Sequence, residues 1–129
     1  MLIDLSGQDI VHWSLPGDLD IGGISSLAAA DLLATMEIAR MFGMDRICNL
    51  IIQEHAEQII MITRIGEGFL LFVAATRDVP LGLARVAVKQ ISTVMLVIIG
   101  NAAATQPPQH HALSNTFEAA FTEQLEKIW

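Results

Sequence analysis

The stretch Ile47–Ala75, ICNLIIQEHAEQIIMITRIGEGFLLFVAA, decides the fold. It contains three apolar runs rich in β-branched residues, and short polar turns separate them. Such a pattern predicts three consecutive antiparallel strands, at Ile47–Glu54, Gln58–Ile65 and Phe69–Ala75. The last run is apolar at successive positions, so both faces of the sheet that contains it must be covered.

A hairpin and a helix are expected before these three strands. Met1–Leu5 and Ile10–Leu15 predict two short strands, because the residues between them, Ser6-Gly7-Gln8-Asp9, have the composition of a turn. Ile24–Phe42 is rich in Ala, Leu and Met and predicts a helix, for which Gly43 is a natural C-terminal stop.

A second long helix and a tail are expected after the strands. Pro80 favours a helix start at Leu81, and Gly100 predicts that this helix ends at Ile99. The predicted domains are therefore a folded domain at 1–101, a linker at 102–114 and a C-terminal amphipathic helix at 115–129.

The order of these elements is ββ-α-βββ-α. It predicts an α/β fold of the α+β kind: a five-stranded antiparallel sheet with one long helix on each face, plus the C-terminal tail helix.

Composition and charge exclude several classes of protein. The chain has 129 residues, of which 53% are hydrophobic and 16% charged, and its formal net charge is −7. An acidic chain is a poor ligand for nucleic acid or for an anionic membrane surface. Cys48 is the only cysteine, which fits a cytoplasmic protein without an internal disulfide. No signal peptide and no membrane insertion are expected, since no run of consecutive apolar residues approaches ~20.

The helix expected over Ile24–Phe42 is unusually apolar. Its hydrophobic residues cover an arc of roughly 220°, whereas one packing contact needs a stripe of only ~100°. Ser26, Glu37 and Arg40 mark the polar face that remains. A deeply buried helix in a monomer is one interpretation. The small size of the domain favours another, in which the helix contacts its own sheet and a second copy of itself.

Four segments in order carry a resemblance to a known family. They are Ile3–Gly7 in the first hairpin, Ile38–Gly43 at the end of the central helix, Ile65–Leu71 before the last helix, and Leu81–Arg85 within it. Over about residues 1–100 the chain resembles the roadblock family, the dynein-light-chain-related domains that bind Ras-like small GTPases. The chain departs from the family in one respect, because members usually begin with a helix before the first strand.

The resemblance implies a two-fold homodimer in which the third strand pairs with its mate and the central helices lie side by side. That arrangement would cover both the wide apolar arc and the exposed strand edge. The interface residues that it implies are Leu27, Asp31, Leu32, Ala34, Ile38, Ile47, Asn49, Ile51 and Gln53. A GTPase can sit across the paired helices in the family, which makes Ser26, Glu37 and Arg40 candidate partner contacts. A solvated helix face explains these three residues equally well.

The tail carries one apolar stripe, formed by Phe117, Phe121, Leu125 and Ile128. We expect this stripe to dock on the exposed sheet, in its own chain or in its dimer mate. Binding to another protein and a frayed tail are the alternatives, and a frayed tail would leave large apolar side chains in water.

Candidate catalytic or metal-binding residues are sparse. His12 and His55 have no Cys or second His at ligand spacing, and His110-His111 are expected to be solvated. We therefore expect no metal, no cofactor and no enzymatic activity. The predicted function is that of a non-catalytic homodimeric adaptor or regulator of a small Ras-like GTPase. The alternatives are a profilin-like small-molecule sensor domain and a scaffold subunit without a GTPase partner.

Overall fold

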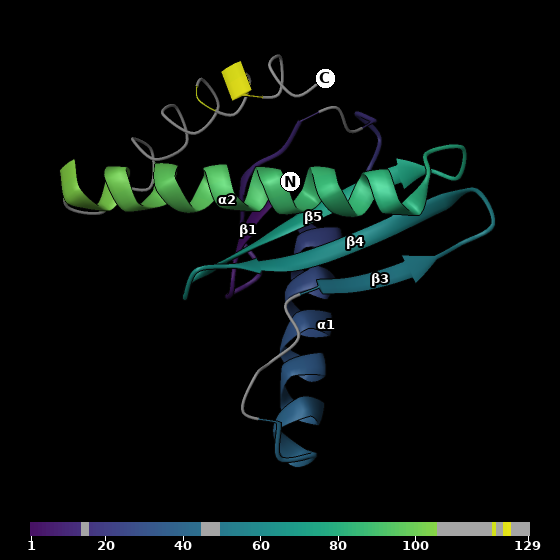
Figure 1. The fold of residues 1–129 in the computed structure, drawn as a ribbon, viewed down its shortest axis with the longest axis horizontal. Coiled ribbons are helices and arrows are strands. Elements are labelled where there is room, and N and C mark those ends of the chain that lie inside the picture. The colour runs from purple at the N-terminus through teal and green to yellow at the C-terminus, as the bar shows by residue number, and fades with distance from the viewer. Residues whose placement is uncertain (14–15, 45–49, 106–119, 121–122, 125–129) are drawn as a thin grey trace. The chain divides into compact units, whose positions relative to one another are not determined.

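The computed structural model describes residues 1–13, 16–44, 50–105, 120, 123 and 124, which fall into two compact units, 1–80 and 81–129 (Figure 1). The first unit contains β1 (Leu2–Asp4), β2 (Asp9–Val11), α1 (Ile21–Met41), β3 (Leu50–Glu54), β4 (Gln58–Ile65) and β5 (Phe69–Thr76). The second unit contains α2 (Leu81–Thr105).

The five strands form one antiparallel sheet in the order β2-β1-β5-β4-β3. β4 pairs along its whole length with β5, from Gln58 opposite Thr76 to Ile65 opposite Phe69. β1 is inserted between β5 and β2, so the N-terminal hairpin completes the sheet that β3–β5 begin. The predicted five-stranded antiparallel sheet and the order ββ-α-βββ-α are confirmed.

The core of the first unit lies between α1 and one face of the sheet. It comprises Met1, Ile3, Ala28, Ala29, Leu32, Ile62 and Leu70. The two alanines allow the helix backbone to approach the strands closely. The other face of the sheet also carries buried apolar side chains, at Leu2, Met61, Ile65 and Leu71. Both faces are therefore apolar, as the sequence pattern required.

The start of α1 differs from the sequence prediction. The helix begins at Ile21 and not at Ile24, although Gly22 and Gly23 have low helix propensity. Asp20 is the N-cap, and its Oδ1 accepts a hydrogen bond from the backbone N–H of Gly23 at 3.0 Å. This bond satisfies one of the free amides of the first turn and offsets part of the cost of the two glycines.

Gly43 and Gly100 were both expected to end a helix, and they behave differently. Gly43 has a φ of 71°, and the N–H of Met44 donates to the carbonyl of Ala39 at 3.1 Å, which is the Schellman arrangement of a helix end. α2 instead continues through Gly100 to Thr105. A glycine inside a helix costs only about 1 kcal/mol, and the alanine-rich sequence that follows favours continuation.

α2 has one buried stripe at helical spacing, formed by Ala84, Val88, Ile91 and Met95. Leu83 lies outside this stripe, and its side chain is 59% exposed. It lies about a quarter turn away from Ala84 around the helix, which is enough to place it in solvent.

Two helices are long and apolar enough to cross a membrane by length and composition alone, in a search of the described residues. They are α1 and the part Leu81–Ala103 of α2. This finding differs from the expectation above, because that expectation counted only uninterrupted apolar runs. For α1 the composition has another physical cause: one side lies in the core, and the remaining surface carries Asp31, Glu37 and Arg40.

The N-terminal amine of Met1 is buried and donates a hydrogen bond to the carbonyl of Phe72 at 2.8 Å. Burial lowers the pKa of this amine from 8.0 to about 6. Between those pH values the unfolded chain binds a proton that the folded chain does not. The unfolding free energy should therefore fall as the pH is lowered from about 8 to about 6, by on the order of 2 kcal/mol.

Urea denaturation at a series of pH values tests this prediction on a chain that starts at Met1 with a free amine. The same chain with an acetylated N-terminus is the control, since it cannot bind the proton but keeps every histidine. The difference between the two pH profiles isolates the amine. Parallel profiles would show that the amine titrates alike in the folded and unfolded chains.

Candidate functional site

α1 has two apolar stripes on different sides of the helix. The first faces the sheet and includes Ala28, Ala29, Leu32 and Ala39, which are buried. The second, here called the outer stripe of α1, follows a spacing of four, three, four and three residues. It consists of Leu27, Asp31, Ala34, Ile38 and Met41. Alternate spacings of three and four place these residues in one line along the helix.

The outer stripe of α1 is exposed over most of its length. Leu27 is 73% exposed, Ile38 56% and Met41 77%. Phe42 and Met44, which follow the end of the helix, are also exposed. Large apolar side chains gathered in this way are typical of a surface that binds another protein.

The length of α1 explains why its end is uncovered. Twenty-one residues of helix span about 31 Å, whereas five strands spaced about 4.8 Å apart are only ~19 Å wide between the outer strands. Figure 1 shows that α1 crosses the strands and that its C-terminal part extends past β3. This part of the helix cannot be covered by the sheet of its own chain.

β3 forms the edge of the sheet at which α1 extends. Among the described strands it pairs only with β4, from Leu50 opposite Thr63 to Glu54 opposite Ile59. Its residues Leu50–Gln53 are half-buried. An edge strand of this composition can pair with another strand, and natural proteins usually cover such an edge or protect it.

One hydrogen bond joins the outer stripe to the β3 edge. The side-chain amide of Gln53 donates to Oδ2 of Asp31 at 2.6 Å, and both groups are partly buried. The bond explains how an acidic residue is accommodated in an apolar stripe, since the carboxylate has a donor directed at it. It also fixes β3 beside the middle of α1, so the stripe and the edge form one continuous surface.

Next to the outer stripe, α1 has another exposed side, here called the polar flank, which consists of Leu33, Glu37 and Arg40. Glu37 and Arg40 form an ion pair in it, with Arg40 Nη2 2.6 Å from Glu37 Oε1 and Arg40 Nε 3.0 Å from Glu37 Oε2. The hydrogen bond from Arg40 lowers the pKa of the Glu37 carboxyl, and the pKa of Arg40 is raised in return. Leu33, at 44% exposed, stands on the same flank.

Ser26, the third predicted partner contact, lies near the other end of α1. Its hydroxyl is 3.5 Å from the carbonyl of Gly7 in the β1–β2 turn. Gly7 has a φ of 92°, and a Cβ at this position would lie 3.0 Å from Cα of Ser26. Fourteen residues of helix, or about 21 Å, separate Ser26 from Arg40. The structure therefore brings Glu37 and Arg40 together but leaves Ser26 at a distance.

The other predicted site residues divide into three groups. Ile51 is half-buried and packs against the core on the α1 face of β3. Leu32 is fully buried in the core of the protomer and has no surface to offer to a second copy, which corrects its expected place at the interface. Ile47, Asn49 and the tail residues Phe117, Phe121, Leu125 and Ile128 lie outside the described residues.

Sequence reasoning missed the exposure of Leu33, Phe42 and Met44. It counted Phe42 among the residues of one wide apolar arc. The available signal was the three-and-four spacing within that arc, which separates the outer stripe from the core-facing stripe. The same spacing would have placed Met41 in the outer stripe and Leu32 opposite it.

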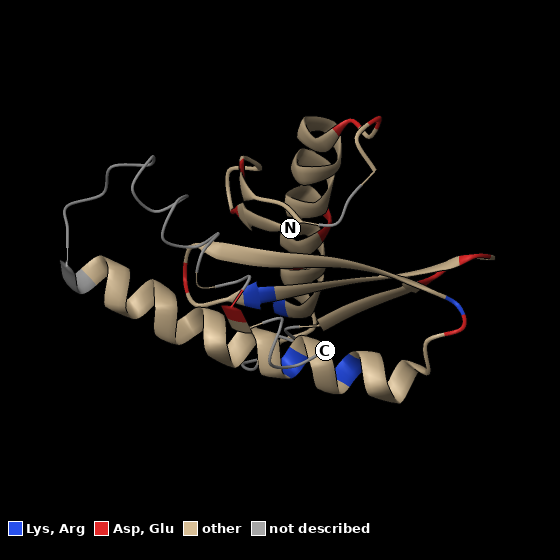
Figure 2. Cartoon of the chain, turned by 90° about the horizontal axis from the view of Figure 1, so that it is seen from above, with Lys and Arg blue, Asp and Glu red and all other residues tan. Residues whose placement is uncertain are grey.

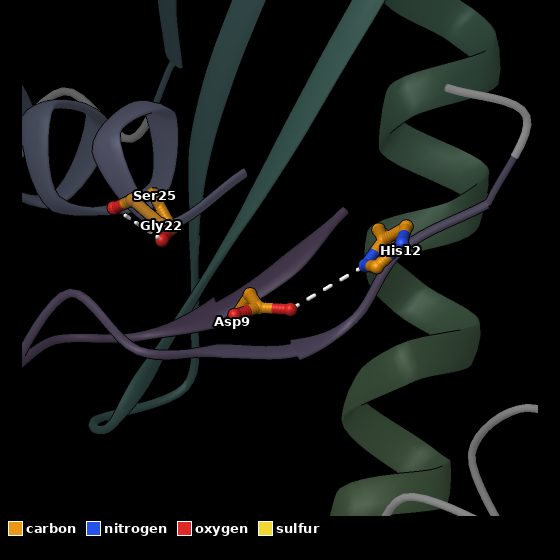
Figure 3. A network of polar contacts seen from close by, with 4 residues as sticks. All are labelled: Asp9, His12, Gly22 and Ser25. Carbon is orange, nitrogen blue, oxygen red and sulfur yellow. Dashed lines mark hydrogen bonds and ion pairs between the residues drawn. The ribbon is translucent and has the colours of Figure 1, made fainter. Parts of the chain in front are cut away.

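The polar side chains of the described residues were expected to hold no metal ion. The described residues contain no group of three or more His, Cys, Asp and Glu side chains that could hold a metal ion. His12 Nδ1 lies 3.4 Å from Oδ2 of Asp9 on the surface. The hydroxyl of Ser25 is fully buried and donates to the carbonyl of Gly22 at 3.0 Å, directed into its own helix and not towards His12 (Figure 3).

Comparison with known proteins supports this description of the fold. No protein-family model matches the chain, and no curated protein matches it. Among solved structures, Myxococcus xanthus MglB is 25% identical with a TM-score of 0.73, over 78% of this chain and 80% of that one. A structure described as MglB with tetrameric arrangement is 21% identical with a TM-score of 0.56, over 92% and 76% of the two chains.

A further similar structure carries the family name. The Roadblock/LC7 domain from Streptomyces avermitilis is 20% identical to this chain with a TM-score of 0.59, over 81% of this chain and 82% of that one. The similarity extends over most of both proteins. The chain therefore has the roadblock fold.

Proposed function

We propose that the chain is a non-catalytic homodimeric adaptor or regulator that acts in the cytoplasm and binds a small Ras-like GTPase. The observation that carries this proposal is the continuous surface formed by the outer stripe of α1 and the β3 edge. The roadblock fold and its resemblance to GTPase-associated domains supply the class of partner.

The dimer is the first part of the proposal. Two copies related by a two-fold axis would pair β3 with β3 in an antiparallel manner and extend the sheet through both protomers. Each α1 would then gain a surface that covers its outer stripe. Ala34 at the centre of the stripe allows close approach of two helices, and Ile38 and Met41 supply the apolar area.

The GTPase is the second part. The polar flank with Leu33, Glu37 and Arg40 is next to the outer stripe but does not coincide with it, so it stays exposed when the stripe is covered. Exposed surface ion pairs add little to the stability of a protomer, which leaves this one available to a partner. A mixed flank of one apolar and two charged residues can provide both affinity and specificity.

Replacement of Arg40 by glutamate tests the flank. We expect this variant to bind its GTPase at least about tenfold more weakly, because it places a like charge beside Glu37 and removes a donor from the contact surface. The assay is calorimetry with a panel of purified Ras-like GTPases from the source organism, each loaded with GDP or with a non-hydrolysable GTP analogue.

Arg77→Glu is the matched control. Arg77 is also an exposed arginine paired with a glutamate, at 3.2 Å from Glu54, but it follows β5 in the chain and is not part of α1. This variant should bind within about twofold of the unmodified chain. Equal losses in the two variants would exclude the flank as the contact surface. A dimer that binds no GTPase of the panel would instead support the scaffold subunit.

A further inference from the structure

α2, like α1, carries a second stripe of exposed residues, and the residues at both ends of this stripe are apolar. The outer stripe of α2 follows a spacing of three, four, three and four residues and consists of Leu83, Val86, Gln90, Thr93 and Val97. All five are exposed, with Val86 at 53% and Val97 at 59%. They lie on a different side of the helix from the buried stripe.

The outer stripe of α2 contains no charged residue. Its ends are apolar, and its centre, Gln90 and Thr93, is polar but neutral. Figure 2 shows long uncharged stretches along α2. The charged residues of the α2 sequence are Arg85 and Lys89, both basic. An occupant of this stripe should therefore be apolar at its ends, neutral in its centre and acidic overall.

The C-terminal segment of the same chain meets this description. Phe117, Phe121, Gln124 and Ile128, here called the tail stripe, are spaced by four, three and four residues. Leu125, which belongs to the wider apolar stripe described above, is adjacent to Gln124. Residues 115–129 contain three glutamates and one lysine. The described tail residues Ala120, Glu123 and Gln124 are helical, and of these Glu123 is exposed and Gln124 half-buried.

One antiparallel register places each residue of the tail stripe opposite a residue of the outer stripe of α2, and only Leu83 has no counterpart. It places Val97 opposite Phe117, Thr93 opposite Phe121, Gln90 opposite Gln124 and Val86 opposite Ile128. Both stripes then span eleven residues of helix, or about 16 Å. The two glutamines meet in the centre, and a neutral polar pair at such a position specifies the register of paired helices.

The segment between α2 and the tail stripe is long enough for the tail to reach back to the outer stripe of α2. Val97 lies eight residues before the end of α2, or about 12 Å along the helix. The residues between Thr105 and Phe117 can extend over about 40 Å, so the tail can reach back to this point. Residues 81–129 also form one compact unit of the fold.

We propose that residues 115–129 fold back as a helix onto the outer stripe of α2 in their own chain, and not onto the sheet as expected from the sequence. The tail stripe and the outer stripe of α2 form an antiparallel helix pair in the register given above. A short linker gives the tail a millimolar effective concentration at its own α2, which favours this site over the same site on another copy. The inference does not depend on the dimer or on a GTPase partner.

Disulfide crosslinking of the full chain tests the register. In a Cys48→Ser background, the facing pair Val86→Cys with Ile128→Cys is compared with the non-facing pair Val86→Cys with Glu126→Cys. Mild oxidation with oxidised glutathione joins two thiols and reduces the glutathione. Products are separated by non-reducing electrophoresis and identified by mass spectrometry.

We expect the facing pair to close within one chain at least about tenfold faster than the non-facing pair. Equal rates for the two pairs would overturn the register. Covalent dimers from the facing pair would show that the tail docks on another copy and would overturn docking in the same chain.

Single glutamate substitutions on α2 give an independent readout. Val97→Glu should remove hydrogen-exchange protection from amides of residues 117–128, because it places a charge opposite Phe117. Leu96→Glu is the control, since Leu96 is similarly exposed but lies off the stripe. Protection that is unchanged in Val97→Glu, or lost equally in both variants, would contradict the proposal.

Discussion

Replacement of Ile38 by glutamate is expected to convert the dimer into monomers. Ile38 lies in the outer stripe of α1, three residues before the end of the helix, and it is more than half exposed. In a two-fold dimer every substitution enters the interface twice. Two carboxylates would lose water without a positive partner, and they would also repel each other across the axis. The dissociation constant should rise at least about 100-fold, which corresponds to about 3 kcal/mol.

Light scattering over a range of protein concentrations measures this effect. Leu33→Glu is the matched control, because Leu33 is another exposed apolar residue of α1 that lies on the polar flank. This control should keep the mass of a dimer, whereas Ile38→Glu should show the mass of one chain. Comparison of the two variants thus shows whether the outer stripe or the polar flank of α1 forms the dimer interface.

Three outcomes would contradict the proposed dimer. If the unmodified chain were a monomer at about 100 µM, the outer stripe would belong to a different protein partner. If Ile38→Glu stayed dimeric while the unmodified chain was a dimer, the two copies would meet through another surface. Loss of the dimer in Leu33→Glu alone would assign the interface to the flank.

The sheet was predictable because three of its strands correspond to separate apolar runs in the sequence. β4 begins and ends at the predicted residues, and β5 is longer than predicted only by Thr76. Helix does not compete with strand in these segments, because β-branched residues disfavour helix. Glycines mark the turn between β4 and β5. The order of the elements then leaves few topologies for an antiparallel sheet.

The site was harder to predict, because a periodic pattern does not say which of two apolar sides faces the core. In α1 both sides are apolar, so Leu32 and Ile38 looked equivalent in sequence. The structure separates them: Leu32 is buried against the sheet, and Ile38 is exposed. The Asp31–Gln53 hydrogen bond joins residues 22 apart in the chain and has no local signal. Only the fold brings them together.

The helix ends show a different limit of sequence reasoning. Gly22, Gly23 and Gly100 all lie inside helices, where a glycine is tolerated at a cost of about 1 kcal/mol. Gly43 ends α1 because the chain there takes up a left-handed conformation. Glycine permits that conformation but does not impose it. The composition of the following residues and the cap decide which outcome occurs.

Replacement of Leu32 by alanine is expected to destabilise the protomer strongly. Leu32 is completely buried, and it packs within the cluster that joins α1 to the sheet. The substitution removes buried apolar surface and leaves a cavity that the surrounding side chains fill only in part. Comparable buried leucines lose 2–5 kcal/mol on truncation, and we expect about 3 kcal/mol here. Urea denaturation, with the slope of the transition unchanged, measures this loss.

The concentration dependence of this loss distinguishes the core from the interface. A residue of the protomer core should lower the unfolding free energy by the same amount at every protein concentration, whereas a pure interface residue acts through the dimer equilibrium. Leu33→Ala, one position away on an exposed side of α1, should change stability by less than about 0.5 kcal/mol. If Leu32→Ala left the protomer equally stable and weakened only the dimer, Leu32 would belong to the interface. The core would then have to be held by the other side of α1, with the outer stripe turned towards the sheet.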